Sequence, residues 1–403
     1  MKKRYVIVGA GMRCYTMFVR NLLDHFSDYA EIVGVYDTNK VRSAFFKSKI
    51  GDGCTQYFSF EEMLSKERPD AVIVTTPDSF HHEYIVRALD LGFDAISEKP
   101  ITNTYERCLE IMEAEKRSGK RVTVTFNCRY MPFFTKVKEI VASGKLGRIM
   151  AINYDYYVNR THGADYFKRW HRLMEFSEGM LLHKSTHHFD IINWILEDEP
   201  RLVTALADKI YYSDNSKMLS ERCRNCEGKD SCESALMQFD ELSEELYYKA
   251  ESEDGYIRDK CAFSEGSDIY DNMSVSVKYG KGTLLTYALN LFSQKEGFRL
   301  VITGEDGAIV ARRGDLGGGK NGILLLDREG NAEEIEFDDG EGSHMGGDLK
   351  LLSHIFAGDS GDPLGRRAKS FDGFSSALIG IGANISIKEG KTVDLTPYLN
   401  KLR

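Results

Sequence analysis

The sequence predicts an α/β protein in which an N-terminal doubly wound parallel sheet is followed by a second domain with an antiparallel sheet and flanking helices. Three observations support this prediction. Short β-branched runs alternate with helix-length amphipathic stretches as far as residue 127, a glycine-rich turn follows the first run, and later strand-like runs succeed one another directly. The 403 residues also exceed one ordinary core, so we expect domains over residues 1–128 and 129–403.

The first domain is expected to contain five strands, at 5–8, 32–36, 71–75, 93–97 and 122–126, and a helix at 15–25. Its apolar strands lack polar alternation, which is typical of a parallel sheet covered by helices on both faces. In the second domain we expect helices at 133–143, 181–196 and 370–389 and a flexible glycine turn at 317–319. The strands expected there are 148–157, 272–279, 283–293, 298–304 and 308–312.

Composition excludes several classes of function. The net charge is −9 and no basic block is present, so a nucleic-acid partner is not expected. No run approaches the roughly 18 apolar residues of a membrane span, and the first apolar run is too short for a signal peptide. Four cysteines, Cys14, Cys54, Cys108 and Cys128, are scattered singly, which suits a reducing compartment. We therefore expect a soluble, cytoplasmic protein.

The first strand runs into Gly9-Ala10-Gly11-Met12-Arg13-Cys14, a dinucleotide-binding fingerprint with cysteine at its third small position. Gly9 permits the tight turn, and Gly11 lets a pyrophosphate approach the backbone at the start of a helix. Asp37 follows the second strand and can accept hydrogen bonds from ribose hydroxyls, although it can also simply begin a turn. Its charge favours NAD over NADP, and the nearby Lys40 and Arg42 moderate that preference.

Two further strands end in Thr75-Thr76-Pro77 and Glu98-Lys99-Pro100, where open α/β sheets bind ligands. Lys99 is therefore expected to point into the cleft, the alternative being a surface lysine before a turn. Here the chain resembles the Gfo/Idh/MocA family, the relatives of glucose–fructose oxidoreductase and inositol dehydrogenase. The resemblance rests on Gly9-Ala10-Gly11, Thr76-Pro77, His81, Glu98-Lys99-Pro100, Asn127, Arg129 and the segment 179–194.

The resemblance implies a Rossmann domain followed by an α/β domain with a large, mostly antiparallel open sheet, often used for dimer or tetramer contacts. It implies NAD-dependent action on sugars or polyols, with Lys99 as the catalytic lysine that holds the substrate hydroxyl and assists proton transfer. The residues expected at the cofactor are Gly9, Gly11, Met12, Arg13, Asp37, Thr75, Thr76, Pro77, His81, Glu98, Lys99 and Asn127. Arg129 is expected at the substrate.

The segment 179–190 departs from the family pattern G-x-L-x-D-x-G-x-H-x-x-D. His183 replaces the aspartate and Ser185 the glycine, whereas His187 keeps the place of the family histidine. On one continuous helix His183, His187, Asp190 and Trp194 would share a face toward the substrate. Three interpretations stay open: His187 as general base or hydroxyl-binding group beside His183, a divalent metal held by both histidines, or structural histidines.

Upstream, Trp170, His171 and Arg172 suit stacking on a sugar and hydrogen bonding to it, or are equally a core tryptophan and surface charges. His344, near the start of a late helix, either returns to the cleft or belongs to a glycine turn that caps the helix.

The other four cysteines, Cys223, Cys226, Cys232 and Cys261, lie in a charge-dense insertion at about 212–268 that typical family members lack. Their spacing fits a structural zinc site, with an iron–sulfur cluster or reduced or disulfide-linked thiols as alternatives. The neighbouring residues 254–259 are candidates for one lip of the substrate cleft.

These observations predict hydride transfer between nicotinamide and a hydroxyl-bearing carbon of a sugar, glycoside or polyol, with Lys99, His187 and His183 as catalytic residues. A glycosidase that retains NAD through oxidation, elimination and re-reduction is one alternative. A dinucleotide-binding sensor without turnover is another, which Lys99 argues against.

Overall fold

The computed structural model describes residues 1–236, 240–314, 316, 320–338, 340, 342–358 and 361–402. Its N-terminal part is a seven-stranded sheet with strand order β15-β6-β5-β4-β1-β2-β3, in which β1 to β6 run parallel and β15 is antiparallel. The order reverses between β1 and β4, so the carboxyl ends of these strands form a topological switch point. The strands are β1 Lys3–Val8, β2 Ala30–Tyr36, β3 Thr55–Tyr57, β4 Ala71–Val74, β5 Asp94–Ser97, β6 Val122–Val124 and β15 Ala368–Lys369.

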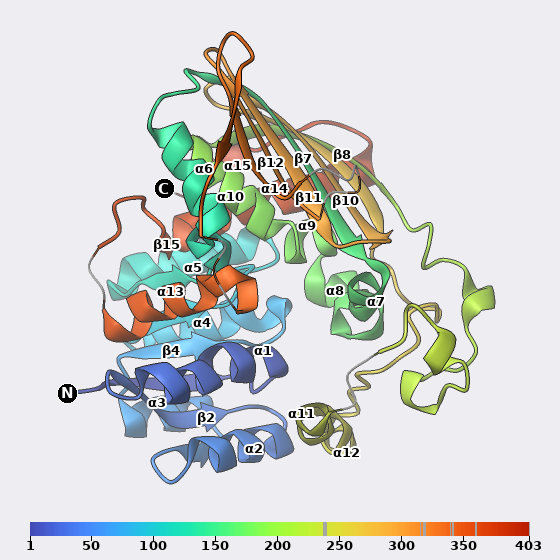
Figure 1. Cartoon of the computed structure of the whole chain (residues 1–403). Helices are drawn as coiled ribbons and strands as arrows, with labels where there is room; N and C mark the ends of the chain where they lie inside the picture. Colours follow the sequence, from blue (N-terminus) through green and yellow to red (C-terminus); the bar gives the residue numbers. More distant parts are fainter. Residues whose placement is uncertain are drawn as a thin grey trace.

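Helices cover both faces of this sheet, which confirms the predicted doubly wound fold (Figure 1). The helix after the glycine turn starts three residues before the predicted position and continues from α1 through η1 to η2. Asn39 caps α2, since its side chain accepts hydrogen bonds from the backbone N–H groups of Val41 and Arg42. The helices are α1 Met12–Cys14, η1 Tyr15–Val19, η2 Leu22–Phe26, α2 Lys40–Ile50, α3 Phe60–Glu67, η3 Asp78–Phe80, α4 His81–Asp90, α5 Tyr105–Ser118 and η4 Asn127–Tyr130.

The second part is a nine-stranded sheet with strand order β14-β13-β12-β11-β7-β10-β9-β8-β16. Its pairs are antiparallel except β7 with β10, which run parallel in its middle. This confirms the predicted large, mostly antiparallel sheet. The strands are β7 Ile149–Asn159, β8 Pro200–Asp208, β9 Asn272–Tyr279, β10 Leu284–Ser293, β11 Gly297–Gly304, β12 Ala308–Arg313, β13 Gly322–Leu326, β14 Ala332–Ile335 and β16 Val393–Asp394.

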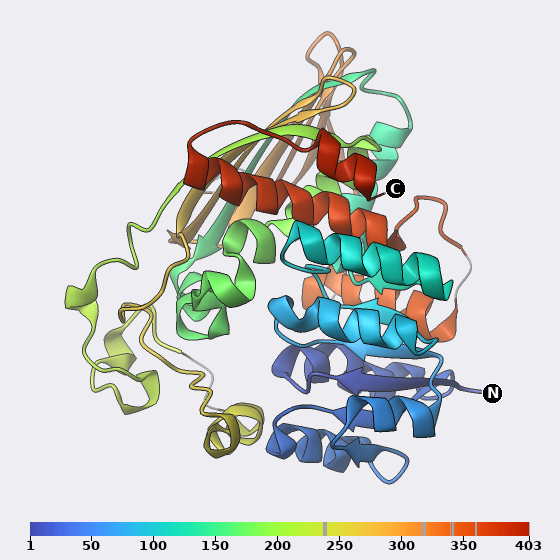
Figure 2. The same ribbon diagram turned by 180° about the vertical axis from the view of Figure 1, so that it is seen from behind.

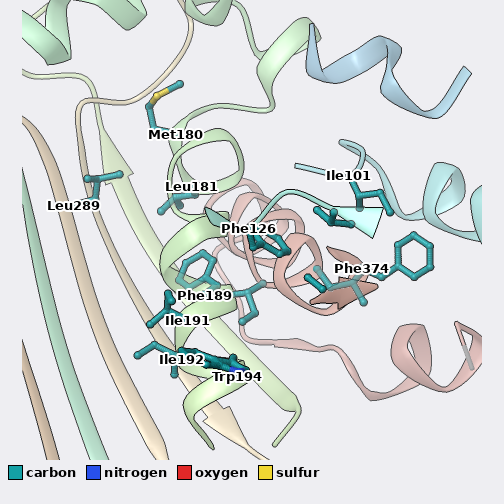
Figure 3. Packing of buried hydrophobic residues seen from close by; sticks show 14 of the residues in the cluster. Ile101, Phe126, Met180, Leu181, Phe189, Ile191, Ile192, Trp194, Leu289 and Phe374 are labelled. Atoms are coloured by element: carbon teal, nitrogen blue, oxygen red, sulfur yellow. The ribbon is translucent and has the colours of Figure 1, made fainter. Parts of the chain in front are cut away.

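Helices cover one face of the second sheet, and alternate residues of β9 are buried and exposed accordingly (Figure 2). In Figure 3, apolar side chains of α10 lie between this sheet and Phe126 of the first domain, and Phe374 of α14 lies beside Ile101, so one core joins the two parts. The helices are α6 Pro132–Ala142, α7 Arg160–Lys168, η5 Trp170–Arg172, α8 Met174–Ser177, α9 Met180–His183, α10 Thr186–Leu196, η10 Ser343–Gly346, α13 Gly347–Leu352, η11 Ser353–Ala357, α14 Ser370–Glu389 and α15 Thr396–Lys401.

The predicted single helix over 181–196 is wrong, because the chain breaks at Lys184 and Ser185 between α9 and α10. The backbone N–H of Ser185 donates to the carbonyl of Met180 at 2.9 Å, and its hydroxyl donates to the same carbonyl at 3.1 Å. This local bonding replaces the regular helical pattern. His183 and His187 therefore stand on different helices.

The cysteine-containing insertion leaves the second sheet after β8 and returns at β9. At its neck, the carboxylate of Asp271 accepts hydrogen bonds from the backbone N–H groups of Ile210, Tyr211 and Tyr212. Its far end reaches α2 of the first domain (Figures 1 and 2). It contains η6 Asn215–Lys217, η7 Cys223–Asn225, η8 Lys229–Ser231, α11 Glu241–Ser243, η9 Glu244–Tyr248 and α12 Glu251–Asp254.

The chain returns to the first sheet near its C-terminus, where α13 and η11 pack beside the early helices and β15 pairs with β6 (Figure 1). The predicted glycine turn at 317–319 lies outside the described residues. None of the helices in the described ranges is both long and apolar enough to cross a bilayer.

Candidate functional site

The glycine turn at the switch point has the close approach that a dinucleotide site needs. Gly9 has a φ of +92°, and a Cβ atom there would lie 2.6 Å from backbone atoms of Thr75 and Thr76. A Cβ atom on Gly11 would meet only the hydroxyl of Tyr247, at 3.9 Å. Gly9 is thus required by the packing of β1 against β4, whereas Gly11 leaves its side of the turn accessible to a ligand.

Asp37 ties the end of β2 to this turn. One carboxylate oxygen accepts from the backbone N–H of Ala10 at 2.7 Å, and the other accepts from the N–H of Asn39 at 2.7 Å and from Nε of Arg42 at 3.4 Å. An ionised carboxylate offers about four acceptor sites. Asp37 therefore has a fixed orientation and retains capacity for a ribose hydroxyl.

Lys99 lies at the carboxyl end of β5 and is partly buried. Its Nζ donates to the backbone carbonyl of His183 at 2.8 Å, and its own backbone N–H donates to Glu98, which also accepts from Nε of Arg13 at 2.8 Å. Burial lowers the pKa of Lys99 to about 8, although the charges of Asp78 and Glu98 oppose this shift. The amine can therefore gain or lose a proton near neutral pH.

A carboxylate from another strand end lies beside position 183, where this chain has a histidine in place of the family aspartate. Asp78, 2% exposed at the start of η3, lies with Oδ2 2.6 Å from Nδ1 of His183. Burial raises the pKa of Asp78 and lowers that of His183 well below its usual range. Because Nδ1 of His183 is occupied by Asp78, Nε2 is the ring nitrogen left for another partner. Sequence analysis missed Asp78, although it directly follows Thr76-Pro77 at a strand end.

His187 is an imidazole with a buried nitrogen. Within the described part of the chain, Nδ1 of His187 has no hydrogen-bond partner, and the ring stands edge-on to Phe126 at 6.0 Å. Burial lowers the pKa of His187 well below its usual range, and the nearby charges of Lys99 and His344 add to the effect. His187 is therefore neutral at pH 7, and its buried Nδ1 makes no hydrogen bond within the described part of the chain.

Three of the residues considered in the sequence analysis contact the carboxylate of Asp348. It accepts from Nδ2 of Asn127 at 2.6 Å, lies 3.1 Å from Nδ1 of His344, and pairs with Arg13 at 3.6 Å. His344 thus lies beside Asp348 and Asn127, and it also belongs to the glycine turn whose Gly346 is the N-cap of α13. Asn127 is fully buried, and its amide is oriented by Asp348.

The expected helix face of histidines does not form. His183 binds Asp78, Asp190 binds the guanidinium of Arg129, and Nε1 of Trp194 donates to the carbonyl of Leu364 at 2.7 Å. The two histidines of the predicted metal pair stand on α9 and α10 instead of on one continuous helix. Among the described residues, no group of three or more His, Cys, Asp or Glu side chains is arranged to hold a metal ion.

Arg129, expected at the substrate, is engaged in the protein interior. It is 2% exposed, and its guanidinium donates to Asp190 at 2.8 and 2.5 Å, to Asp372 at 3.0 Å and to the carbonyl of Gly365 at 3.3 Å. These contacts join η4, α10 and α14. The prediction of substrate contact is corrected, because the donors of Arg129 are directed at these partners.

His81, expected at the cofactor, is also buried. Its Nδ1 lies 2.7 Å from the carbonyl oxygen of Pro100, and its Nε2 lies 2.8 Å from that of Thr76. His81 therefore joins the loops after β4 and β5 and positions Lys99 and Pro77 rather than contacting a ligand itself.

Trp170 and His171 lie beside the catalytic candidates, whereas Arg172 does not. The rings of Trp170 and His171 stack at 3.6 Å, and both stand edge-on to His183, at 5.7 and 4.2 Å. Arg172 is buried and donates to the carbonyls of Ser264 and Glu265 in the insertion. The substrate role predicted for Arg172 is corrected to an anchor for the insertion.

A further polar chain at this site had no signal in the sequence. Glu296 lies 2.9 Å from Nδ1 of His162, whose Nε2 lies 2.9 Å from the hydroxyl of Tyr166. The Tyr166 ring is edge-on to His183 at 5.8 Å. Lys184 is close to this group: burial lowers its pKa, but Tyr156, Tyr166 and Glu296 raise it to a net increase.

The four cysteines of the insertion line one pocket together with Lys217, Arg222 and Phe263. All four are free thiols, and Cys232 is exposed. Their convergence agrees with the spacing argument, but the sulfur positions do not form a metal-holding group in the described structure. The predicted zinc site is therefore not supported.

Comparison with known proteins connects this geometry to a family. Residues 3–126 match the family model described as "Oxidoreductase family, NAD-binding Rossmann fold", and residues 138–395 match "Oxidoreductase family, C-terminal alpha/beta domain". The chain is 35% identical over 422 aligned residues to YteT of Bacillus subtilis (strain 168), which is named as an oxidoreductase, and the alignment covers 98% of each protein. It is 26% identical over 194 residues to inositol 2-dehydrogenase of Corynebacterium glutamicum (strain R), covering 48% of this chain and 53% of that enzyme.

Solved structures share the whole fold. The WlbA dehydrogenase from Bordetella pertussis, crystallised with NADH and UDP-GlcNAcA, superposes with a TM-score of 0.70 and 17% identity and covers 98% of this chain and 99% of its own. The myo-inositol 2-dehydrogenase from Lactobacillus plantarum superposes with a TM-score of 0.67 at 17% identity, covering 98% and 99%. At such low identity these likenesses show the fold alone.

Proposed function

Because the chain belongs to the Gfo/Idh/MocA family of oxidoreductases, we propose that it transfers hydride between NAD and a hydroxyl-bearing carbon of a sugar or polyol. The observation that carries the proposal is Lys99. It stands at the carboxyl end of β5, on the same sheet edge as the glycine turn, with a lowered pKa and with Asp78, His183 and His187 beside it.

The residues at the switch point fit a dinucleotide. The bare side of Gly11 would face the pyrophosphate, the start of the helix at Met12 would favour its charge, and Asp37 would accept from the ribose. Bound NAD supplies a hydride acceptor at the nicotinamide ring.

During oxidation of an alcohol, the O–H proton must leave as the C–H bond gives up its hydride. The neutral amine of Lys99 accepts this proton at Nζ, and the resulting ammonium stabilises the alkoxide that forms in the transition state. In the reverse direction, the ammonium returns the proton to the carbonyl oxygen. A pKa of about 8 makes both protonation states available near neutral pH.

The two histidines orient the substrate. Asp78 fixes the His183 ring through Nδ1, and the neutral, partly exposed ring of His187 would bind a substrate hydroxyl. The partly exposed ring of Trp170, which is backed by the buried His171, suits the C–H face of a sugar ring. A polyhydroxylated substrate would satisfy these donors and acceptors at once.

Two further properties belong to this proposal. The outer face of the nine-stranded sheet carries exposed Leu206 and Leu284, and we assign it to a second copy of the chain in a dimer or tetramer. The eight free thiols support a reducing location, the cytoplasm. Light scattering of the purified protein tests the first of these, and a monomer at micromolar concentration would contradict it.

The decisive experiment is to incubate the protein with NAD and a panel of monosaccharides, inositols and glycosides while following nicotinamide absorbance at 340 nm. We expect reduction of NAD with at least one polyol and its loss in Lys99→Met. Cleavage of an aryl glycoside without net absorbance change would replace the proposal with a redox-assisted glycosidase. Binding of NAD without turnover of any substrate would indicate a sensor.

A further inference from the structure

The insertion that typical family members lack reaches the dinucleotide site. Leu246 of η9 is fully buried in the apolar cluster of the first domain, against which Tyr15 and Phe45 also pack. The neighbouring hydroxyl of Tyr247 accepts a hydrogen bond from the backbone N–H of Met12 at 3.0 Å, directly at the glycine turn. The far end of the insertion is thus part of the wall around the turn.

A second set of contacts lies at the ribose end. Nδ2 of Asn39, which caps α2, donates to the carbonyl of Ala250 at 2.9 Å, so α12 is held against the start of α2. There Asp254 binds Nη2 of Arg42 at 2.5 Å, and Glu253 lies 3.8 Å from Nζ of Lys40. Arg42 and Lys40 are the two cations nearest to Asp37 in the sequence.

These contacts change how the ribose end discriminates between dinucleotides. NADP differs from NAD by a 2′-phosphate, which an arginine beside the ribose carboxylate commonly accommodates. Here Arg42 is held between Asp37 and Asp254, at 3.4 and 2.5 Å. A phosphate would have to displace Asp254 from Arg42. It would also lie near three carboxylates, those of Asp37, Glu253 and Asp254, and only two cations, Lys40 and Arg42.

We propose that Asp254 of the insertion determines the cofactor preference by sequestering Arg42, so that the insertion converts a moderate preference for NAD into a strong one. This inference rests on the proposed function only in that NAD is the cofactor. It gives the insertion a role that needs no metal and no contact with the substrate.

The test is a double-mutant cycle on binding, read by calorimetric titration of the full chain with NADH and with NADPH. Asp254→Asn keeps the shape of the side chain and removes its charge. We expect it to tighten NADPH binding by about tenfold or more, because the Asp254 carboxylate no longer competes with the 2′-phosphate for Arg42. NADH binding should change by less than about threefold. Adding Arg42→Gln to this variant should abolish the gain, whereas Arg42→Gln alone should leave NADPH binding weak.

Glu305→Gln is the matched control. It removes one carboxylate from an exposed ion pair with Arg148 on the second sheet, and the ratio of the two dissociation constants should stay as in the wild type. A wild-type protein that binds NADPH as tightly as NADH, or an Asp254→Asn variant that keeps the wild-type ratio, overturns the inference. Failure of the wild type to bind either dinucleotide would instead refute the proposed function.

Discussion

Replacing Arg129 by methionine should destabilise the protein without touching the site. Methionine retains much of the apolar stem and removes the charge, which leaves Asp190 buried without its partner. Breaking a buried ion pair from one side costs about 3–5 kcal/mol. Arg129 is 2% exposed and makes two bonds to Asp190, at 2.8 and 2.5 Å, so we expect a loss within that range.

Urea unfolding followed by intrinsic fluorescence measures the loss as a lower midpoint at unchanged slope. Arg148→Met is the control, since it removes an exposed pair with Glu305 and should cost less than about 1 kcal/mol. Burial raises the pKa of Asp190, so without Arg129 its carboxyl takes up a proton as pH falls. The pKa of Asp190 in the folded variant then lies above its value in the unfolded chain. The loss in free energy of unfolding caused by Arg129→Met is therefore smallest at acidic pH and grows as pH rises. An Arg129→Met protein of wild-type stability but with weakened substrate binding would refute the reasoning.

Three other outcomes are expected. Gly9→Ala should weaken NAD binding at least about tenfold, because its Cβ atom would lie 2.6 Å from the backbone of Thr75; wild-type affinity by calorimetry would contradict this. The rate of alcohol oxidation by the wild type should increase as pH rises toward about 8, where the amine of Lys99 loses its proton, and then level off. Lys99→Arg should be slower by about 10²–10⁴-fold, and its rate should not show that increase with pH. Asp78→Asn should lower kcat/KM by about 10–100-fold through a misoriented His183, with NAD affinity unchanged; an effect below twofold would show that the bond at 2.6 Å is not needed.

Local patterns predicted most of the fold. The strand at 272–279 and the helix at 370–389 have the predicted bounds, because alternation in the first and a glycine just beyond the second are strong signals. The three-residue strand β3 is too short to show a period, and the break between α9 and α10 has neither proline nor glycine to mark it. That break depends on Ser185 bonding back to Met180 instead of continuing the helix.

Contacts between distant segments account for what the sequence did not reveal at the site. Asp78 and His183 are 105 residues apart, and Asp254 meets Arg42 across 212 residues. Arg129 shows the opposite case, since its place in a family motif suggested ligand contact, whereas its position in space makes it an interior ion pair. Motif position indicates where a residue stands in the chain, and only the tertiary structure shows which way it faces.

The late return of the chain to the first sheet affects how the molecule can be divided. β15 occupies the outer edge of β6, and α13 with η11 packs against η4 and η2, so residues beyond 340 complete a layer begun at residue 3. A fragment ending at residue 128 would have an unpaired strand edge at β6. It would also expose the apolar surface of the first domain that Leu351, Leu352 and Phe356 cover in the whole chain. Such a fragment should aggregate, and the intact chain should melt in one transition, because neither half has a finished core of its own.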